Sequence, residues 1–223
     1  MLCRCFSLAD IHLATNNFDD ALVVGRGGFG KVYKGFINDG TTVVAVKLLN
    51  AESKQGAKEF WTEIKTLSTL RHPHLVTLIG YSDEFSEMIL VYEYMINGTL
   101  AELLYKMSRK RYGPDFHHLN WEQRINVCIG AARGLDYLHT EKRVIHSDVK
   151  TTNILLDENR KAKISDFGLS RMGTTNQLQT HCRNTSLIYS SHNEVVRQRK
   201  SDEDEHRPVL WVVEEQSQED GPM

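Results

Sequence analysis

Residues 144–168 read V-I-H-S-D-V-K-T-T-N-I-L-L-D-E-N-R-K-A-K-I-S-D-F-G, and this stretch decides how the rest of the chain is interpreted. Two short apolar runs in it, Ile154–Leu156 and Ala162–Ile164, have the composition of β-strands, and the turn-forming residues 157–159 join them. A hairpin of this kind folds the chain back on itself. The polar clusters before and after it are therefore predicted to converge on one side.

The converging side chains are Asp148, Lys150, Asn153 and Asp166. Hard cations such as Mg²⁺ prefer oxygen ligands, which carboxylates and amides supply. A carboxylate can also accept the proton of a substrate hydroxyl, and a lysine can bind phosphate. The combination predicts chemistry on Mg²⁺ and phosphate groups.

Length and composition limit the classes of protein that are possible. The 223 residues suffice for one large domain or two small lobes, and 40% hydrophobic with 25% charged residues is ordinary for a globular protein. The net charge of −2 gives no indication of nucleic acid as a partner. No apolar run approaches the roughly 20 residues that span a bilayer, and the N-terminus lacks a signal-peptide core. We expect a cytoplasmic protein, and any association with the plasma membrane would come through a partner or through a transmembrane segment upstream of Met1.

The cysteines, Cys3, Cys5, Cys128 and Cys182, form no C-x-x-C pair. Reduced thiols in a cytosolic protein are the simplest interpretation, and S-acylation at Cys3 or Cys5 is the alternative.

A glycine-rich segment lies near the N-terminus, where residues 23–35 read V-V-G-R-G-G-F-G-K-V-Y-K-G. Alone, G-x-G-x-x-G marks a dinucleotide-binding fold, a phosphate loop or a flexible turn. The residues after Gly30 alternate between polar and apolar, which favours a strand, whereas a Rossmann loop opens a helix. A strand–loop–strand arrangement would let backbone N–H groups approach phosphates.

The next strand and helix carry a candidate ion pair. Asn38-Asp39-Gly40 predicts a turn, and residues 42–49 then form a strand that contains Lys47. Residues 57–70 show helical periodicity, with two glutamates, Glu59 and Glu63, one turn apart. Either glutamate could face the lysine on this evidence.

The remaining elements are predicted from periodicity and turn signals. Residues 1–20 form a leader with a short helix over 8–14, and strands are expected over 75–81 and 88–94. The segment Glu93-Tyr94-Met95 then forms either a hinge whose backbone binds an adenine edge, with Tyr92 behind it, or a plain core strand.

The longest helix is predicted over 121–139, after a polar surface loop at 106–120 whose basic triplet could bind an acidic partner. Its expected buried face consists of Trp121, Ile125, Cys128, Ile129, Ala132, Leu135 and Leu138.

Between about Phe6 and Thr180 the chain resembles plant receptor-like protein kinases of the Pelle-related group. The segments F-S-L-A-D-I-x-x-A-T-N-N-F, A-A-R-G-L-x-Y-L-H and K-I-S-D-F-G-L-S-R carry the resemblance. T-T-N-I-L-L-D and M-G-T-T-N are similar to the Feronia-type subset, whose receptors carry malectin-like ectodomains. The resemblance implies an α+β, protein-kinase-like fold of two lobes with a small β-sheet N-lobe and a helical C-lobe.

The resemblance also implies a role for individual residues. ATP and Mg²⁺ would be the cofactors, and a protein substrate or a related receptor kinase the partner. Lys47, held by Glu63 rather than Glu59, would bind the α- and β-phosphates, and Asp148 would accept the substrate proton. Lys150 would neutralise the γ-phosphate and points to Ser/Thr substrates. The metal ligands would be Asn153 and Asp166. An internal hydrophobic spine would consist of Leu67, Leu78, His146 and Phe167. The other ATP contacts would be Gly25, Arg26, Gly27, Gly28, Phe29, Gly30, Val32, Ala45, Glu93 and Met95.

Two departures from the family pattern stand out. Ser147 replaces the arginine that pairs with a phosphorylated activation loop, and the resemblance ends after Thr180 without a Pro-Glu motif. We therefore expect four parts: a leader (1–20), an N-lobe (21–95), a partial C-lobe (96–182) and a divergent, disordered tail (183–223) from altered splicing or a truncated gene model. Part of the apolar face of the long helix would then lie open, and the platform that holds a peptide substrate beside Asp148 would be absent.

Three functional hypotheses follow. The first is an ATP-dependent Ser/Thr protein kinase. The second is a catalytically impaired kinase that acts as an ATP-binding or partner-binding module. The third is an unstable fragment without a role.

Overall fold

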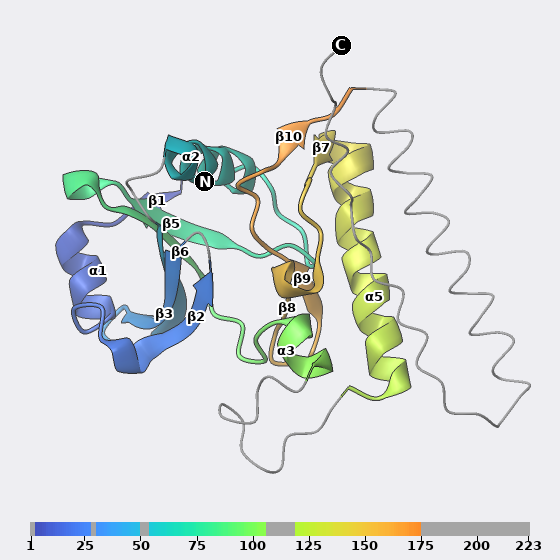
Figure 1. Cartoon of the computed structure of the whole chain (residues 1–223), viewed down its shortest axis with the longest axis horizontal. Coiled ribbons are helices and arrows are strands. Elements are labelled where there is room, and N and C mark those ends of the chain that lie inside the picture. Colours follow the sequence, from blue (N-terminus) through green and yellow to red (C-terminus); the bar gives the residue numbers. More distant parts are fainter. Residues whose placement is uncertain (1–2, 28–29, 50–53, 106–118, 175–223) are drawn as a thin grey trace, which may run out of the picture.

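The computed structural model describes residues 3–27, 30–49, 54–105 and 119–174. Some predictions concern residues outside these ranges: Gly28 and Phe29 of the glycine loop, the surface loop at 106–118, Cys182 and the tail at 183–223. The described part consists of a β-sheet with one long helix packed against it, followed by a mainly helical region (Figure 1). This is the α+β architecture that the sequence predicts.

The sheet has six strands in the order β1-β5-β6-β4-β3-β2. Neighbouring strands are antiparallel except for β1, which runs parallel to β5. The predicted turn at Asn38-Asp39-Gly40 joins β3 to β4, and both Asn38 and Asp39 have positive φ angles. Helix α2 (Lys54–Leu67) packs against β5 and β6. The strands are β1 (Arg4–Cys5), β2 (Val23–Gly27), β3 (Gly30–Ile37), β4 (Thr42–Leu49), β5 (Leu78–Ser82) and β6 (Met88–Glu93).

The leader adds one strand to the sheet and packs a short helix against it. Helix α1 (Leu8–Ala14) has the predicted bounds because Ser7 and Asp10 form a capping box at its start. Phe6 is buried, and its N–H donates to the carbonyl of Tyr81 at 2.8 Å. A Cβ at Gly80 would lie 2.4 Å from the Phe6 ring, so only glycine admits the leader at this point. Strand β1 therefore extends the sheet and α1 packs against β3, although we expected the N-lobe to begin at residue 21.

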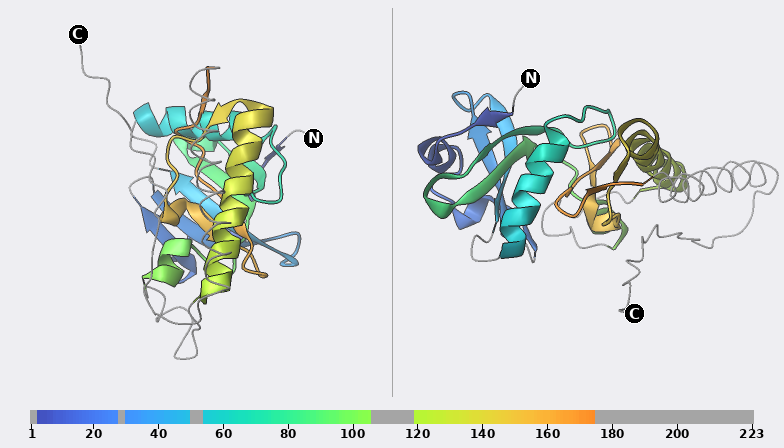
Figure 2. Two further views of the ribbon diagram at one scale, coloured as in Figure 1. Left: turned by 90° about the vertical axis from the view of Figure 1, so that its right-hand side faces the viewer. Right: turned by 90° about the horizontal axis from the view of Figure 1, so that it is seen from above.

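The second region surrounds the hairpin that the sequence predicts. Strands β8 (Ile154–Leu156) and β9 (Ala162–Ile164) pair antiparallel, and Ile154 lies opposite Ile164. Helix α5 (Trp121–Asp136) flanks the hairpin, as Figure 2 shows from two sides. The other elements are α3 (Leu100–Leu104), β7 (Val144–Ile145), β10 (Arg171–Met172), a π-helical turn (Tyr137–Lys142) and short 3₁₀ turns (Asp20–Leu22, Glu84–Ser86 and Thr151–Asn153).

The buried face of α5 agrees with the predicted one only in part. Ala132, Leu135 and Leu138 are buried as predicted, whereas Trp121 and Cys128 are exposed, and the helix also buries smaller residues that were not predicted. At Gly130 a Cβ would lie 2.8 Å from the ring of His74, and at Gly134 one would lie 2.9 Å from the carbonyl oxygen of His74. The prediction counted large apolar side chains, but the glycines define the contact because they let the chain at His74 approach the helix. The buried strip comprises Val127, Gly130, Ala131, Ala132, Gly134 and Leu135.

One hydrophobic core connects the sheet to the helical region. It contains Leu67 and Leu78 from the sheet side and Leu135, Leu138 and Phe167 from the other side. The predicted strand over 75–81 begins only at Leu78 because the residues before it pair with β9: the N–H of Val76 donates to the carbonyl of Ile164 at 2.9 Å. The two regions therefore share a hydrophobic core and are joined by backbone hydrogen bonds.

Candidate active site

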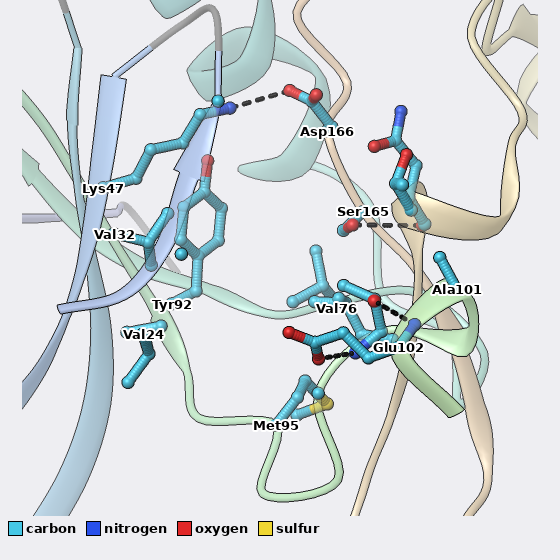
Figure 3. A pocket seen from close by; sticks show the side chains of 18 of the residues that line it. Val24, Val32, Lys47, Val76, Tyr92, Met95, Ala101, Glu102, Ser165 and Asp166 are labelled. Atoms are coloured by element: carbon cyan, nitrogen blue, oxygen red, sulfur yellow. Dashed lines mark hydrogen bonds and ion pairs between the residues drawn. The ribbon is translucent and has the colours of Figure 1, made fainter. Parts of the chain in front are cut away.

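A cleft of about 540 Å³ opens between the sheet and the hairpin (Figure 3). Both regions contribute to its lining, and Lys47 and Asp166 lie together at one end while Met95 lies at the other (Figure 3). Its lining includes every predicted ATP-contact residue that the structure describes: Gly25, Arg26, Gly27, Gly30, Val32, Ala45, Lys47, Glu93 and Met95.

The glycine loop borders the cleft at the ends of strands β2 and β3. Two of its glycines, Gly27 and Gly30, have different surroundings. Gly30 has a φ of +134°, and a Cβ there would meet the carbonyl oxygen of Leu48 on β4. A side chain at this position would break the β3–β4 pairing. A Cβ at Gly27 would meet no atom within 4 Å, so the backbone of Gly27 borders open space. Such a loop lets backbone N–H groups come close to a bound anion.

Lys47 is the centre of a buried ion-pair cluster. Its Nζ lies 2.7 Å from Asp166 Oδ1 and 3.4 Å from Glu63 Oε2. The Glu63 side chain is 1% exposed and that of Lys47 is 14% exposed. Burial by itself would lower the pKa of Lys47, but the carboxylates of Glu63 and Asp166 outweigh it and raise that pKa above its usual range. The ammonium group is therefore held charged at the end of the cleft.

The structure separates the two candidate glutamates of α2. Glu63 contacts Lys47 with one oxygen, and its Oε1 accepts the N–H of Phe167 at 3.2 Å. Glu59 instead accepts a hydrogen bond from Gln55 Nε2 at 3.0 Å and packs its Cβ against Gly168. Glu63 thus connects the strand lysine to the segment that carries Asp166.

Tyr92 lies behind this cluster, as predicted for the back of the pocket (Figure 3). Its hydroxyl is buried, and burial followed by the nearby negative charge of Glu63 raises the pKa of Tyr92 well above its ordinary value. The phenol is neutral at physiological pH.

A second polar cluster forms around Asp148. Lys150 Nζ donates to Asp148 Oδ2 at 2.7 Å, and Asn153 Nδ2 donates to the same oxygen at 2.9 Å. His146 is fully buried and supports the loop, because its Nδ1 accepts the N–H of Asp148 at 3.2 Å. His146 also packs edge to face on Phe167 with ring centroids 4.7 Å apart. The predicted proton acceptor is thereby held beside a lysine and an amide.

The two clusters meet through Ser165. Its N–H and its hydroxyl donate to the carbonyl oxygen of Asn153 at 2.9 and 3.0 Å. Asp166 follows with a φ of +67°, a left-handed conformation that aspartate adopts more readily than most non-glycine residues. The hairpin therefore brings the polar groups together as the sequence predicts.

The predicted metal ligands fit Mg²⁺ by their chemistry. Asn153 donates through Nδ2 to Asp148, which leaves the amide oxygen as its acceptor, and Asp166 contributes a carboxylate. Within the described ranges, no group of three or more His, Cys, Asp or Glu side chains could hold a metal ion by itself. One amide and one carboxylate suit an ion that takes its other ligands from phosphates and water.

Several residues of the cleft were not predicted as site residues. Leu155 lines the cleft from the strand between two buried neighbours, so the alternation of the hairpin sequence could have indicated it. Glu102 accepts the N–H of Thr99 in a capping box, and the T-x-x-E pattern was a visible signal for a helix start. Others, such as Val24, Val76, Ala101 and Thr152, had no local signal.

Comparison with known proteins agrees with this geometry. A family model for protein tyrosine and serine/threonine kinases matches residues 20–210. The match continues past Thr180, where the resemblance by motifs ends. From Arabidopsis thaliana, receptor-like protein kinase FERONIA is 59% identical over 176 residues and THESEUS 1 is 59% identical over 180 residues. These alignments cover 78% and 80% of this chain but only 19% and 20% of the relatives, so the chain spans about a fifth of their length.

ANXUR1 from the same plant is 60% identical over 174 residues, which is 77% of this chain and 20% of that relative. The family model covers the whole cleft, including both polar clusters. The chain therefore belongs to the protein tyrosine and serine/threonine kinase family and is similar to the receptor-like protein kinases of plants.

Proposed function

We propose that this chain binds Mg²⁺–ATP in the cleft and transfers the γ-phosphate to serine or threonine hydroxyls of proteins. The observation that carries the proposal is the buried cluster of Lys47, Glu63 and Asp166 at the end of an apolar cleft. A cation held between two carboxylates beside a glycine loop suits a polyphosphate, and the apolar walls suit a base.

Lys47 would bind the α- and β-phosphates, and Glu63 would keep its ammonium group in place. The glycine loop would cover the phosphates with Gly25, Gly27 and Gly30. Asn153 and Asp166 would hold Mg²⁺, and the chemistry that this ion supplies is neutralisation of charge on the phosphate oxygens.

Asp148 would accept the proton of the attacking hydroxyl and fix its direction. The ammonium group of Lys150 lies 2.7 Å from that carboxylate, which anchors it. From this position Lys150 can neutralise negative charge on the transferred phosphoryl group. In the family pattern a lysine at this position accompanies Ser/Thr substrates. Catalysis of this kind is positioning and electrostatic stabilisation, which the preformed clusters favour.

Ser147 bears on how the activity would be controlled. It has a φ of +67° and carries no charge that could pair with a phosphorylated loop. We therefore propose that phosphorylation of the activation segment does not act through this position.

A place of action at the cytoplasmic face of the plasma membrane is a further part of the proposal, through a partner or an upstream segment. The similarity to receptor-like kinases motivates it. No helix in the described part of the chain combines the length and apolar character needed to cross a membrane.

The test is transfer of labelled γ-phosphate from Mg²⁺–ATP to a mixture of serine, threonine and tyrosine peptides, with Asp148→Asn as the control. Label on serine and threonine peptides that the control lacks would support the proposal. Nucleotide binding without any transfer would favour the second candidate, a binding module, whose motivation is Ser147. Absence of both binding and transfer would refute both candidates.

A further inference from the structure

The carboxylate of Glu93, a residue that lines the cleft, joins three segments of the chain. Glu93 Oε1 accepts the N–H of Thr77 at 2.8 Å and the ammonium of Lys163 at 2.7 Å. The N–H of Glu93 donates in turn to the carbonyl of Thr77 at 3.1 Å. The side chain of Lys163 is 14% exposed and that of Glu93 is 28% exposed, so water screens this pair only in part.

The three segments lead to opposite ends of the cleft. Glu93 ends β6 and precedes Met95, which lines the apolar part. Lys163 lies on β9, from which the chain continues directly to Asp166 at the polar end. Thr77 follows Val76, another residue of the apolar wall.

A backbone seam runs beside this carboxylate. The N–H of Val76 donates to the carbonyl of Ile164, and the N–H of Ile164 donates to the carbonyl of His74, each at 2.9 Å. These bonds fix the chain before β5 against β9 but do not reach β6. The main chain of Glu93 already bonds to Thr77, and the Glu93 side chain adds a direct link from β6 to Lys163 on β9.

We propose that Glu93 and Lys163 are a positioning pair, which sets the spacing between the base-binding end of the cleft and the Asp166 end. The inference rests on the proposed function, because it concerns how the cleft holds both ends of ATP. A ligand that touches both ends gains from a fixed spacing, whereas a ligand that touches one end does not. Charge-assisted hydrogen bonds are strong enough to hold such a spacing when partly buried.

The consequence can be tested with two ligands. Calorimetry would compare Mg²⁺–ATP with Mg²⁺–tripolyphosphate, which occupies only the polar end, for the full chain and its variants. Lys163→Met and Glu93→Gln are each expected to weaken ATP binding about three- to tenfold and to leave tripolyphosphate within about twofold. The double variant should be no weaker than the worse single variant, since both remove the same contact. Lys163→Arg keeps the charge and should restore most of the affinity.

Lys161→Met is the matched control, because Lys161 precedes the same strand and its side chain is exposed. It should change neither affinity. Equal weakening of both ligands would mean general loosening of the fold and would overturn the inference, as would unchanged ATP affinity in both single variants. If the wild-type chain fails to bind Mg²⁺–ATP at all, the proposed function itself is wrong, and this result is distinct from the other two.

Discussion

The two polar clusters of the cleft are held in different ways. Around Lys47, the partners come from a strand, a helix and the segment after the hairpin, and the Glu63 side chain is 1% exposed. Around Asp148, the partners Lys150 and Asn153 lie within five residues in the sequence, and Lys150 is 44% exposed. The first cluster depends on tertiary packing and low local dielectric, and the second on one local loop. Substitutions in the first should therefore affect nucleotide binding and stability, and those in the second mainly the rate of transfer.

Asp166→Asn should have the largest effect on nucleotide affinity. It removes a metal carboxylate and the 2.7 Å partner of Lys47 together. We expect Mg²⁺–ATP binding to weaken on the order of a hundredfold, because two contacts to charged groups are lost. Calorimetric titration measures this, with the exposed Asp136→Asn on α5 as a control that should bind normally. Affinity within threefold of wild type would place Asp166 outside the site.

Glu63→Gln should have the second-largest effect on nucleotide affinity. We expect Mg²⁺–ATP binding to be weaker by about tenfold and the melting temperature to be lower by a few degrees. The amide keeps an acceptor for Phe167 but removes the charge that holds Lys47. Glu59→Gln is the matched control one turn away on the same helix, and it should stay within about twofold for ATP. Equal effects of the two substitutions would contradict the assignment of Glu63.

The pH dependence of stability should reveal the Lys47 cluster. Because the pKa of Lys47 is raised by folding, its contribution to stability is complete below the unfolded pKa of about 10.4 and is lost as pH rises above it. Denaturant unfolding of wild type and Lys47→Met should show a constant difference up to about pH 10, and this difference should shrink at higher pH. A difference that grows with pH would show that the lysine is not held charged.

Asp148→Asn should have the smallest effect on ATP affinity, and it tests the difference between the Lys47 cluster and the Asp148 cluster. ATP binding should stay within about twofold, while phosphotransfer falls by about 10²–10⁴-fold. Filter binding and a radiolabel transfer assay separate these two quantities. A large loss of affinity would show that the Asp148 cluster is part of the nucleotide site, and the proposed division between the clusters would be wrong.

The sequence predicts local features of this fold well and long-range ones poorly. Helix α1 has the expected bounds because its capping box is local, and the β8–β9 hairpin follows from composition and a turn. By contrast, the pairing of Arg4 with Gly80 and the contact of Gly130 with His74 depend on residues far apart in the chain. No local pattern signals such approaches.

The same limit applies to the site. Residue types and spacing indicate Asp148, Asn153 and Asp166, because a hairpin brings them together. Glu59 and Glu63 share one helix face, so periodicity alone does not separate them, and only the packing of α2 does. The Glu93–Lys163 contact joins residues 70 positions apart and has no signal in the sequence.

The most direct test of the central claim is thermal melting of the 223-residue chain with and without Mg²⁺–ATP, beside Lys47→Met. A preformed nucleotide cleft predicts that ligand at a hundredfold its Kd raises the wild-type melting temperature by about 5–10 °C. The variant should show a much smaller rise. An equal rise in both proteins, or none in the wild type, would contradict the claim that the Lys47 cluster forms a working nucleotide site.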